Sequence, residues 1–190
     1  MGADRPALAF MDFEASSLAR SSFQIEVAWV FEDGRSEAHL IRPAPGWDDW
    51  NPDAERIHGI ARDVLERDGS PHDVVARRMV EVLADHDLVA SAPSWDGKWL
   101  SALLRAAGFP RHTLRLRDTE DAQRNIARRL LAGVVHPDAI DAEVEDVLVL
   151  TGVRDRHGVP AHRALADAEE ERQRWMAVRD EAARRRALAN

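Results

Sequence analysis

Runs of apolar residues divide the start of the chain into three segments of strand length. Residues 7–15 and 23–31 are almost continuously apolar, which is typical of buried strands. Glu32, Asp33 and Gly34 form a hairpin signal, and residues 37–42 follow as a returning strand. The pattern therefore predicts that the chain opens with a three-stranded antiparallel meander.

The rest of the chain alternates helical patterns with short apolar strands. A helix capped by Ser70, with Pro71 as its first residue, is expected to run to about residue 85. The remaining elements are short helices at 53–58 and 61–67, strands at 88–91 and 114–118, and helices at 96–107, about 120–131, 139–150 and about 161–188. This order predicts an α/β fold whose mixed five-stranded sheet is flanked by helices.

Length and composition narrow the protein's class. The chain has 190 residues and no break in composition, which predicts one domain over residues 1–190, with a core from about 7 to 170. The absence of cysteine excludes disulfides, cysteine-ligated zinc and iron–sulfur clusters. A formal net charge of −8 argues against a protein that coats duplex DNA without sequence preference.

No segment of the sequence has the pattern of a membrane anchor or a signal peptide. The first apolar stretch, residues 7–13, contains Asp12 and is followed by no small-residue cleavage site. No apolar run approaches the ~20 residues of a membrane span. We therefore expect a cytoplasmic protein that does not enter a membrane.

Asp12 and Glu14 interrupt the first apolar strand. Residues two apart in a strand face the same side of the sheet, with their side chains roughly 6.5 Å apart. Two adjacent like charges are costly to bury without a counter-charge, and divalent cations prefer carboxylate oxygen. The pair indicates either a metal site or a strand that ends at Met11, with both acids in water.

Three further polar residues come from elements later in the chain. Asp96 opens a helix after the strand at 88–91, a position that the helix dipole favours for any acid. His162 and Asp167 lie at the start of the last helix, where an imidazole that titrates near neutrality suits a general base. Each is also compatible with an ordinary surface residue. Together, four carboxylates from three segments can hold two divalent ions about 4 Å apart, an arrangement that hydrolyses phosphodiesters.

The order and spacing of these motifs resemble the DEDDh 3′→5′ exonucleases, the family that includes RNase T, oligoribonuclease and bacterial proofreading subunits. The matching segments are FMDFEASSL with Asp12 and Glu14, SWDGKWL with Asp96, and HRALADA with His162 and Asp167 in the family's His-x4-Asp spacing. A supporting match is NPDAERIHGI, residues 51–60, since relatives often carry an HGI segment between the first two motifs. The resemblance spans about residues 8–168.

The resemblance implies an RNase H-like fold and a two-metal exonuclease. It implies that two Mg²⁺ or Mn²⁺ ions bind to Asp12, Glu14, Asp96 and Asp167. It also implies that His162 deprotonates the attacking water. The products would be nucleoside 5′-monophosphates, released from the 3′ end of single-stranded or frayed nucleic acid.

Residues after the first motif are implied to cradle the terminal nucleotide. The matching positions are Ala15, Ser16, Ser17 and Leu18. His58 lies either near that nucleotide or at a helix terminus with no role in binding. Two departures concern substrate contacts: Leu18 replaces the glycine of the D-x-E-T-T-G pattern, and Ala92 replaces an asparagine that often precedes the second motif.

The resemblance leaves the substrate and the assembly open. Many bacterial relatives of this size process RNA, which favours RNA over DNA. A DNA-directed exonuclease with the same mechanism and a non-catalytic nucleic-acid-binding module are the alternatives. Because all five catalytic positions are present, an enzyme is favoured over the binding module. Some relatives are dimers, so a homodimer is a further arrangement that the resemblance allows.

Aromatic and basic residues outside the motifs also have two interpretations. Trp95 and Trp99 flank Asp96 and are expected in the core. Trp47 and Trp50 lie in a polar loop, where stacking on bases is one interpretation. The arginines of the segment 172–186 are expected on a solvated helix with ion pairs, and contact with substrate phosphates is the alternative.

Overall fold

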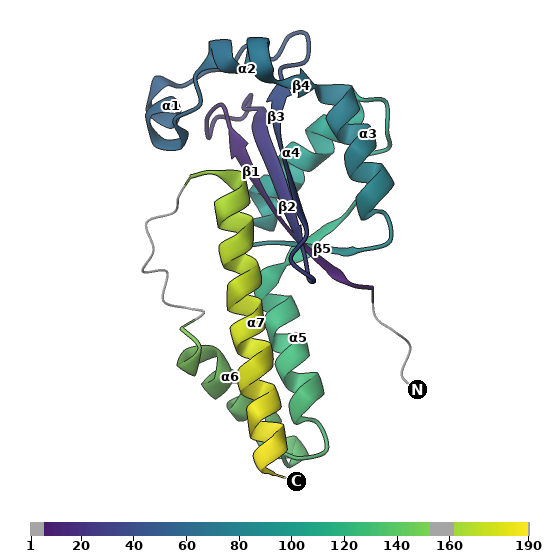
Figure 1. The fold of residues 1–190 in the computed structure, drawn as a ribbon, viewed down its shortest axis with the longest axis vertical. Coiled ribbons are helices and arrows are strands. Elements are labelled where there is room, and N and C mark those ends of the chain that lie inside the picture. The colour runs from purple at the N-terminus through teal and green to yellow at the C-terminus, as the bar shows by residue number, and fades with distance from the viewer. Residues whose placement is uncertain (1–5, 153–161, 190) are drawn as a thin grey trace.

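The computed structural model describes residues 6–152 and 162–189 (Figure 1). Six strands form one mixed sheet in the order β4-β3-β2-β1-β5-β6. They are β1 Leu8–Ala15, β2 Gln24–Phe31, β3 Ser36–Arg42, β4 Ser70–Pro71, β5 Asp87–Ala90 and β6 Leu116–Asp118. The predicted α/β fold with a mixed sheet is confirmed, but the sheet has six strands rather than five.

The helices cover both faces of the sheet (Figure 1). They are α1 Pro52–His58, α2 Arg62–Asp68, α3 His72–Leu83, α4 Pro93–Ala106, α5 Thr119–Leu131, α6 Ile140–Leu150 and α7 Ala164–Leu188. Helices α3 and α4 pack on one face, while α5, α6 and α7 build a second core on the other. In Figure 1, α7 lies beside α5 and runs from the sheet to the C-terminal end.

The alternation of β1 explains how acids come to lie in a buried strand. Ala9, Met11 and Phe13 belong to the core under α3 and α4, whereas Leu8 and Phe10 belong to the core under α5 to α7. Since successive side chains of a strand point to opposite faces, the next two positions on the α7 face fall at residues 12 and 14. The α7 face of β1 therefore changes from apolar to acidic towards its carboxyl end.

Strand pairing brings several element ends to one edge of the sheet. β1 pairs antiparallel with β2, with Glu14 opposite Glu26, and the register shifts after Glu14 so that Ala15 lies opposite Gln24. β1, β5 and β6 are parallel to one another. The carboxyl ends of these three strands therefore meet at the same edge, where α4 and α5 begin.

Some boundaries and burial patterns differ from the sequence-based predictions. Ser70 does not cap α3, because Ser70 and Pro71 pair in parallel with β3 as a two-residue strand and Pro71 takes the cap position. Helix α4 begins at Pro93 rather than at Asp96, since proline is favoured in the first turn. Within α3, Val75 and Met79 are buried, whereas Val74 is 47% exposed. For the last helix, residue 161 lies outside the described residues.

The tryptophans that flank Asp96 divide between core and surface. Trp99 is buried, as predicted, and its indole N–H donates to Ser22 Oγ at 3.1 Å. Trp95 is 38% exposed and packs against Trp99 with ring centroids 5.6 Å apart, so its predicted core position is wrong. Their spacing of four residues places both rings on one side of α4, and only the Trp99 ring reaches the core.

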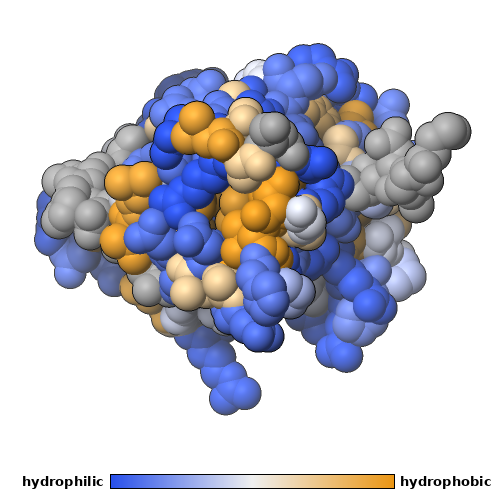
Figure 2. All heavy atoms as spheres, turned by 90° about the horizontal axis from the view of Figure 1, so that it is seen from below, coloured by the Kyte–Doolittle hydropathy of each residue, from blue (hydrophilic) through white to orange (hydrophobic). Residues whose placement is uncertain are grey.

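Ion pairs line α7 from its middle to its C-terminal end, as predicted. Arg174 pairs with Glu170 and Glu171, and Arg185 pairs with Glu143 and Asp146 of α6. Figure 2 views the molecule from this end and shows a largely hydrophilic surface, with hydrophobic residues gathered near its middle. Among residues 6–152 and 162–189, no helix has both the length and the apolar composition needed to cross a bilayer.

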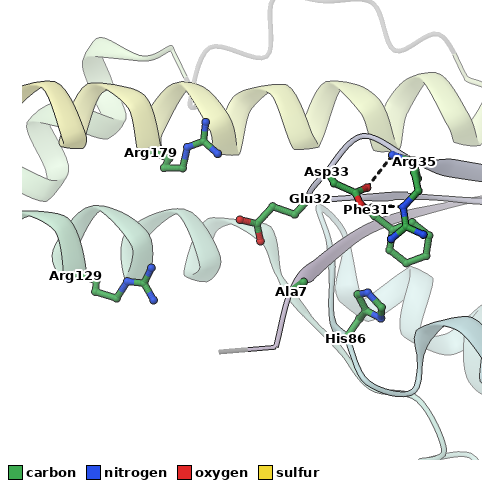
Figure 3. Close-up of a pocket in the computed structure, with 8 residues that line it drawn as sticks. All are labelled: Ala7, Phe31, Glu32, Asp33, Arg35, His86, Arg129 and Arg179. Carbon is green, nitrogen blue, oxygen red and sulfur yellow. Dashed lines mark hydrogen bonds and ion pairs between the residues drawn. The ribbon is translucent and has the colours of Figure 1, made fainter. Parts of the chain in front are cut away.

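A hollow of about 700 Å³ lies at the amino end of β1 (Figure 3). It is bordered by Ala7, by the turn between β2 and β3, and by Arg129 of α5 and Arg179 of α7. Figure 3 shows the two arginines projecting from neighbouring helices, while Asp33 and Arg35 pair with each other. None of the predicted site residues lines this hollow, so it is separate from the acidic end of β1.

Candidate metal centre

Three of the predicted acids converge where α7 crosses β1. Carboxylate oxygens of Asp12, Glu14 and Asp167 all lie within 4.8 Å of one another. Asp12 and Glu14 reach this point because they share a face of β1, and Asp167 because it lies in the first turn of α7, which packs against β1 and β2. Oxygen donors at this separation match the ligands that Mg²⁺ and Mn²⁺ prefer.

The fourth acid lies next to this group. Asp96, in the first turn of α4, is 2% exposed, and its Oδ2 is buried without a hydrogen-bond partner among the described residues. It is not one of the three acids that lie within 4.8 Å of one another. After burial, however, its charge is the largest cause that raises the pKa of Asp12. The structure thus brings three predicted ligands into one cluster and the fourth beside Asp12.

Three of these four carboxyls hold their protons more tightly than ordinary acids. Burial, followed by the charge of Asp167, raises the pKa of Glu14 to about 8. Burial raises the pKa of Asp96 to about 7, although backbone groups of Ala92 and Phe13 act in the opposite direction. The pKa of Asp12 is also raised well above its usual range, first by burial and then by its acidic neighbours. Acids gathered in this way fit a site that a cation completes.

His162 lies at the entrance to α7, two residues before the helix begins. Its φ of 49° is the only positive φ of a non-glycine residue in the described ranges. The charge of His162 is one of the causes that lower the pKa of His58, although burial of His58 is the largest. The two histidines are therefore near one another, on the same side of the molecule as the start of α7.

Sequence reasoning missed the residue that faces Glu14 across the sheet. Glu26 of β2 is buried and accepts hydrogen bonds from the Arg163 guanidinium and from the Ala164 backbone N–H. Glu171, one turn after Asp167, also adds its charge to those that raise the pKa of Asp12. The sequence signal for Glu26 was an acid within the apolar run at 24–31, the same signal that marked the first strand.

The segment after β1 is held by Asp49, which lies in the loop between β3 and α1. The hydroxyl of Ser16 donates to Asp49 at 3.1 Å, and that of Ser17 also donates to Asp49. Ala15, Ser16 and Ser17 are buried, whereas Leu18 is 72% exposed. Of the four residues implied to contact the terminal nucleotide, Leu18 is thus the one whose side chain lies on the surface.

His58 and the two loop tryptophans pack together near this segment. His58 is buried, its Nδ1 accepts the Ile60 backbone N–H at 3.0 Å, and its Nε2 has no hydrogen-bond partner among the described residues. Trp50 meets His58 edge to face at a centroid distance of 6.2 Å. Trp47 stacks on Phe23 at 5.5 Å. Both tryptophans are half-buried and build part of a small apolar cluster.

Comparison with solved structures identifies the fold. No protein-family model and no curated protein matches the sequence. The zinc-bound form of E. coli exonuclease I with single-stranded DNA superposes with a TM-score of 0.66 at 16% identity, over 97% of this chain and 43% of that one. Exonuclease I from Methylocaldum szegediense gives a TM-score of 0.67 at 17% identity, over 96% and 42%.

The similarity is one of fold. Because the identities are 16% and 17%, the comparisons establish that this chain has the architecture of the matching part of exonuclease I, in agreement with the predicted RNase H-like fold. The chain spans less than half the length of those proteins. The architecture places the carboxyl end of β1 where α4 and α7 begin, which is where the acidic centre lies.

Proposed function

We propose that this chain is a divalent-metal-dependent 3′→5′ exonuclease that acts on single-stranded or frayed nucleic acid, with all of it forming one domain. The observation that carries the proposal is the convergence of Asp12, Glu14 and Asp167, with Asp96 beside them, on a fold shared with exonuclease I. The acids come from three separate elements, which is the arrangement that phosphodiester hydrolysis by metal ions needs.

The donor set fits divalent cations. Three carboxylates within 4.8 Å and a fourth buried next to them supply hard oxygen ligands and an excess of negative charge. We infer that two Mg²⁺ or Mn²⁺ ions are held by Asp12, Glu14, Asp96 and Asp167. Bound there, the cations would lower the pKa of the attacking water and neutralise charge on the scissile phosphate.

In this proposal, the protein's own side chains accept the proton and position the terminal nucleotide. We infer that His162, five residues before Asp167 at the entrance to α7, takes the proton from the attacking water through an imidazole nitrogen. Ser16 and Ser17, fixed by Asp49, shape the segment against which the terminal nucleotide rests. Hydrolysis then leaves the 5′-phosphate on the released nucleotide and a new 3′-hydroxyl on the shortened strand.

RNA and single-stranded DNA are both candidate substrates. The sequence resemblance favours RNA, because many relatives of this size process RNA. Single-stranded DNA is the second candidate, favoured by the fold neighbours, since exonuclease I was solved with DNA oligonucleotides. The same catalytic centre serves either polymer, and the choice depends on contacts with the 2′ position.

A cleavage time course tests the proposal. RNA and DNA oligomers of one sequence, labelled at the 5′ end, are incubated with Mn²⁺, Mg²⁺ or EDTA. We expect a ladder that shortens one nucleotide at a time, needs a divalent cation and disappears in Asp12→Asn. Asp63→Asn, an exposed acid on α2, is the matched control and keeps full activity.

Two outcomes would contradict the proposal. Cleavage that persists in Asp12→Asn at the wild-type rate would remove the acidic centre from the mechanism. If neither strand is cut and calorimetry detects no site-specific Mn²⁺ binding, the exonuclease is contradicted and the non-catalytic nucleic-acid-binding module is favoured instead.

A further inference from the structure

Glu26 makes an unusually complete set of contacts for an acid inside a sheet. Its side chain is 4% exposed, and it lies opposite Glu14 in the register of β1 and β2. The Arg163 guanidinium donates to it twice, from Nη2 at 2.7 Å and from Nε at 3.1 Å. The Ala164 backbone N–H donates to the same carboxylate at 3.0 Å. One side chain of β2 therefore binds the two residues at the start of α7.

The residue directly before these two has a disfavoured backbone conformation. His162 has a φ of 49°, in the left-handed region that L-residues other than glycine seldom adopt. Such a conformation persists where the surrounding contacts determine it, and it is often found at functional sites. Here the chain on the helical side of His162 is held by Glu26, through both Arg163 and Ala164.

The electrostatics of Glu26 are unfavourable for an acidic centre. Its charge is among the causes that raise the pKa of Glu14, while the Arg163 charge acts in the opposite direction. An uncharged side chain at residue 26 would avoid this repulsion. An acid at residue 26 is therefore explained by its bidentate pair with Arg163, whose geometry is more specific than that of a single hydrogen bond.

We propose that Glu26, acting with Arg163, is a positioning residue that fixes the backbone at His162 and so aims the imidazole at the attacking water. The proposal rests on the proposed exonuclease function. It assigns Glu26 no contact with substrate or cation; its effect passes through His162.

The test compares two bidentate Glu–Arg pairs of the same sheet. Glu26→Gln weakens the pair at the start of α7. Glu37→Gln weakens the matched pair on β3, where Arg78 donates to Glu37 at 2.8 Å and 3.0 Å. At saturating Mn²⁺ we expect Glu26→Gln to lower kcat about 10-fold or more, part of the 100-fold or larger contribution of a general base, with KM within about 2-fold. Glu37→Gln keeps kcat within about 2-fold of wild type, as expected for a change remote from the centre.

A double-mutant cycle separates positioning from a general structural role. In a His162→Ala background, Glu26→Gln should cause no further loss of kcat, because the residue through which it acts is gone. A second readout needs neither metal nor turnover: amide hydrogen exchange at Ala164 should become faster in Glu26→Gln and stay unchanged in Glu37→Gln. If Glu26→Gln folds poorly, Arg163→Ala removes the same pair from its exposed end and should give the same pattern.

The outcomes distinguish this inference from the function on which it rests. Equal proportional losses from Glu26→Gln in the wild-type and His162→Ala backgrounds would overturn the positioning role while leaving the exonuclease intact. Unchanged exchange at Ala164 would overturn it as well. A wild-type protein that cuts no strand, with Ala164 exchange still sensitive to Glu26, would refute the exonuclease and reduce Glu26 to a structural cap of α7.

Discussion

Replacing Asp96 by asparagine should stabilise the metal-free protein, and the gain should depend on pH. The Asp96 side chain is 2% exposed, with Oδ2 lacking a hydrogen-bond partner among the described residues. Burial raises its pKa from an ordinary 3.8 to about 7. Asparagine keeps the shape of the side chain and cannot ionise, so the substitution isolates the contribution of the charge.

The direction of this pH dependence follows from which state, folded or unfolded, keeps the proton of Asp96. Between pH 3.8 and about 7 the unfolded chain has released the Asp96 proton while the folded protein retains it. Stability therefore falls as the pH rises through this window, by about 4 kcal/mol in all, and is constant above it. From pH 5 to pH 8 the ionisation of Asp96 lowers the free energy of unfolding of the wild-type protein by about 3 kcal/mol, and this loss is absent from Asp96→Asn.

Urea unfolding in EDTA, followed by circular dichroism at pH 5 and pH 8, measures the effect. We expect the stability of Asp96→Asn relative to wild type to rise by about 3 kcal/mol between the two pH values. The cost of burying the asparagine amide, about 1–3 kcal/mol, is the same at both and cancels. Asp121→Asn, at an exposed acid in the first turn of α5, is the control, and its effect should differ by less than about 0.5 kcal/mol between them.

A difference between Asp96→Asn and wild type that is the same at pH 5 and pH 8 would refute this reasoning. It would mean that the Asp96 carboxyl ionises in the folded protein as it does in the unfolded chain. The position of α4 would then have to allow water to reach Asp96, against its burial in the structure.

Three more predictions concern packing and the acidic centre. In urea unfolding, Gly69→Ala should destabilise the protein by about 1–3 kcal/mol, because a Cβ there would lie 2.4 Å from the Leu65 carbonyl oxygen. Gly97→Ala should stabilise it by about 0.5–1 kcal/mol, because the space around a Cβ at this position of α4 is open. Equal effects of the two substitutions would contradict the packing. Trp29→Ala, which removes a fully buried ring, should lower the free energy of unfolding by about 3–5 kcal/mol. Trp95→Ala, at the surface, should lower it by less than about 1 kcal/mol. A larger loss of stability in Trp95→Ala than in Trp29→Ala would refute the assignment of core and surface. Calorimetry in two buffers of different ionisation enthalpy should show that Mn²⁺ binding at pH 7 releases about one proton or more, because burial raises the pKa of Glu14 to about 8. No proton release at pH 7 would mean that the carboxyls are already ionised.

Most elements could be predicted because their hydrophobic patterns are long. The continuous apolar runs of β1 and β2 and the hairpin signal between β2 and β3 define the start of the sheet, and the structure confirms them. β4 was missed because a two-residue strand has no periodicity; its pairing depends on where β3 ends. Trp95 was misplaced because sequence identifies a large apolar ring without telling which side of α4 faces the core.

In the candidate centre, too, some residues could be predicted from the sequence and others could not. Asp12 and Glu14 could be singled out because acids are unexpected in an apolar strand, and Asp167 because it follows His162 at a recognisable spacing. The part played by Glu26 could not be predicted, since it needs the pairing of β2 with β1 and the crossing of α7 above both strands. Contacts between residues 137 positions apart are set by packing, which no local pattern encodes.

Protons and cations compete for the same carboxyls, and this links the stability of the fold to its chemistry. At neutral pH without a cation, the protein relieves the repulsion among its buried acids by keeping protons on Glu14 and Asp96, whose pKa values are about 8 and 7. A divalent cation bound by these acids would stabilise the ionised forms instead, so its binding would displace these protons and become tighter as the pH rises. A rise in pH from 6 to 8 therefore prepares the acidic centre for a divalent cation, because Asp96 and then Glu14 lose their protons over this range.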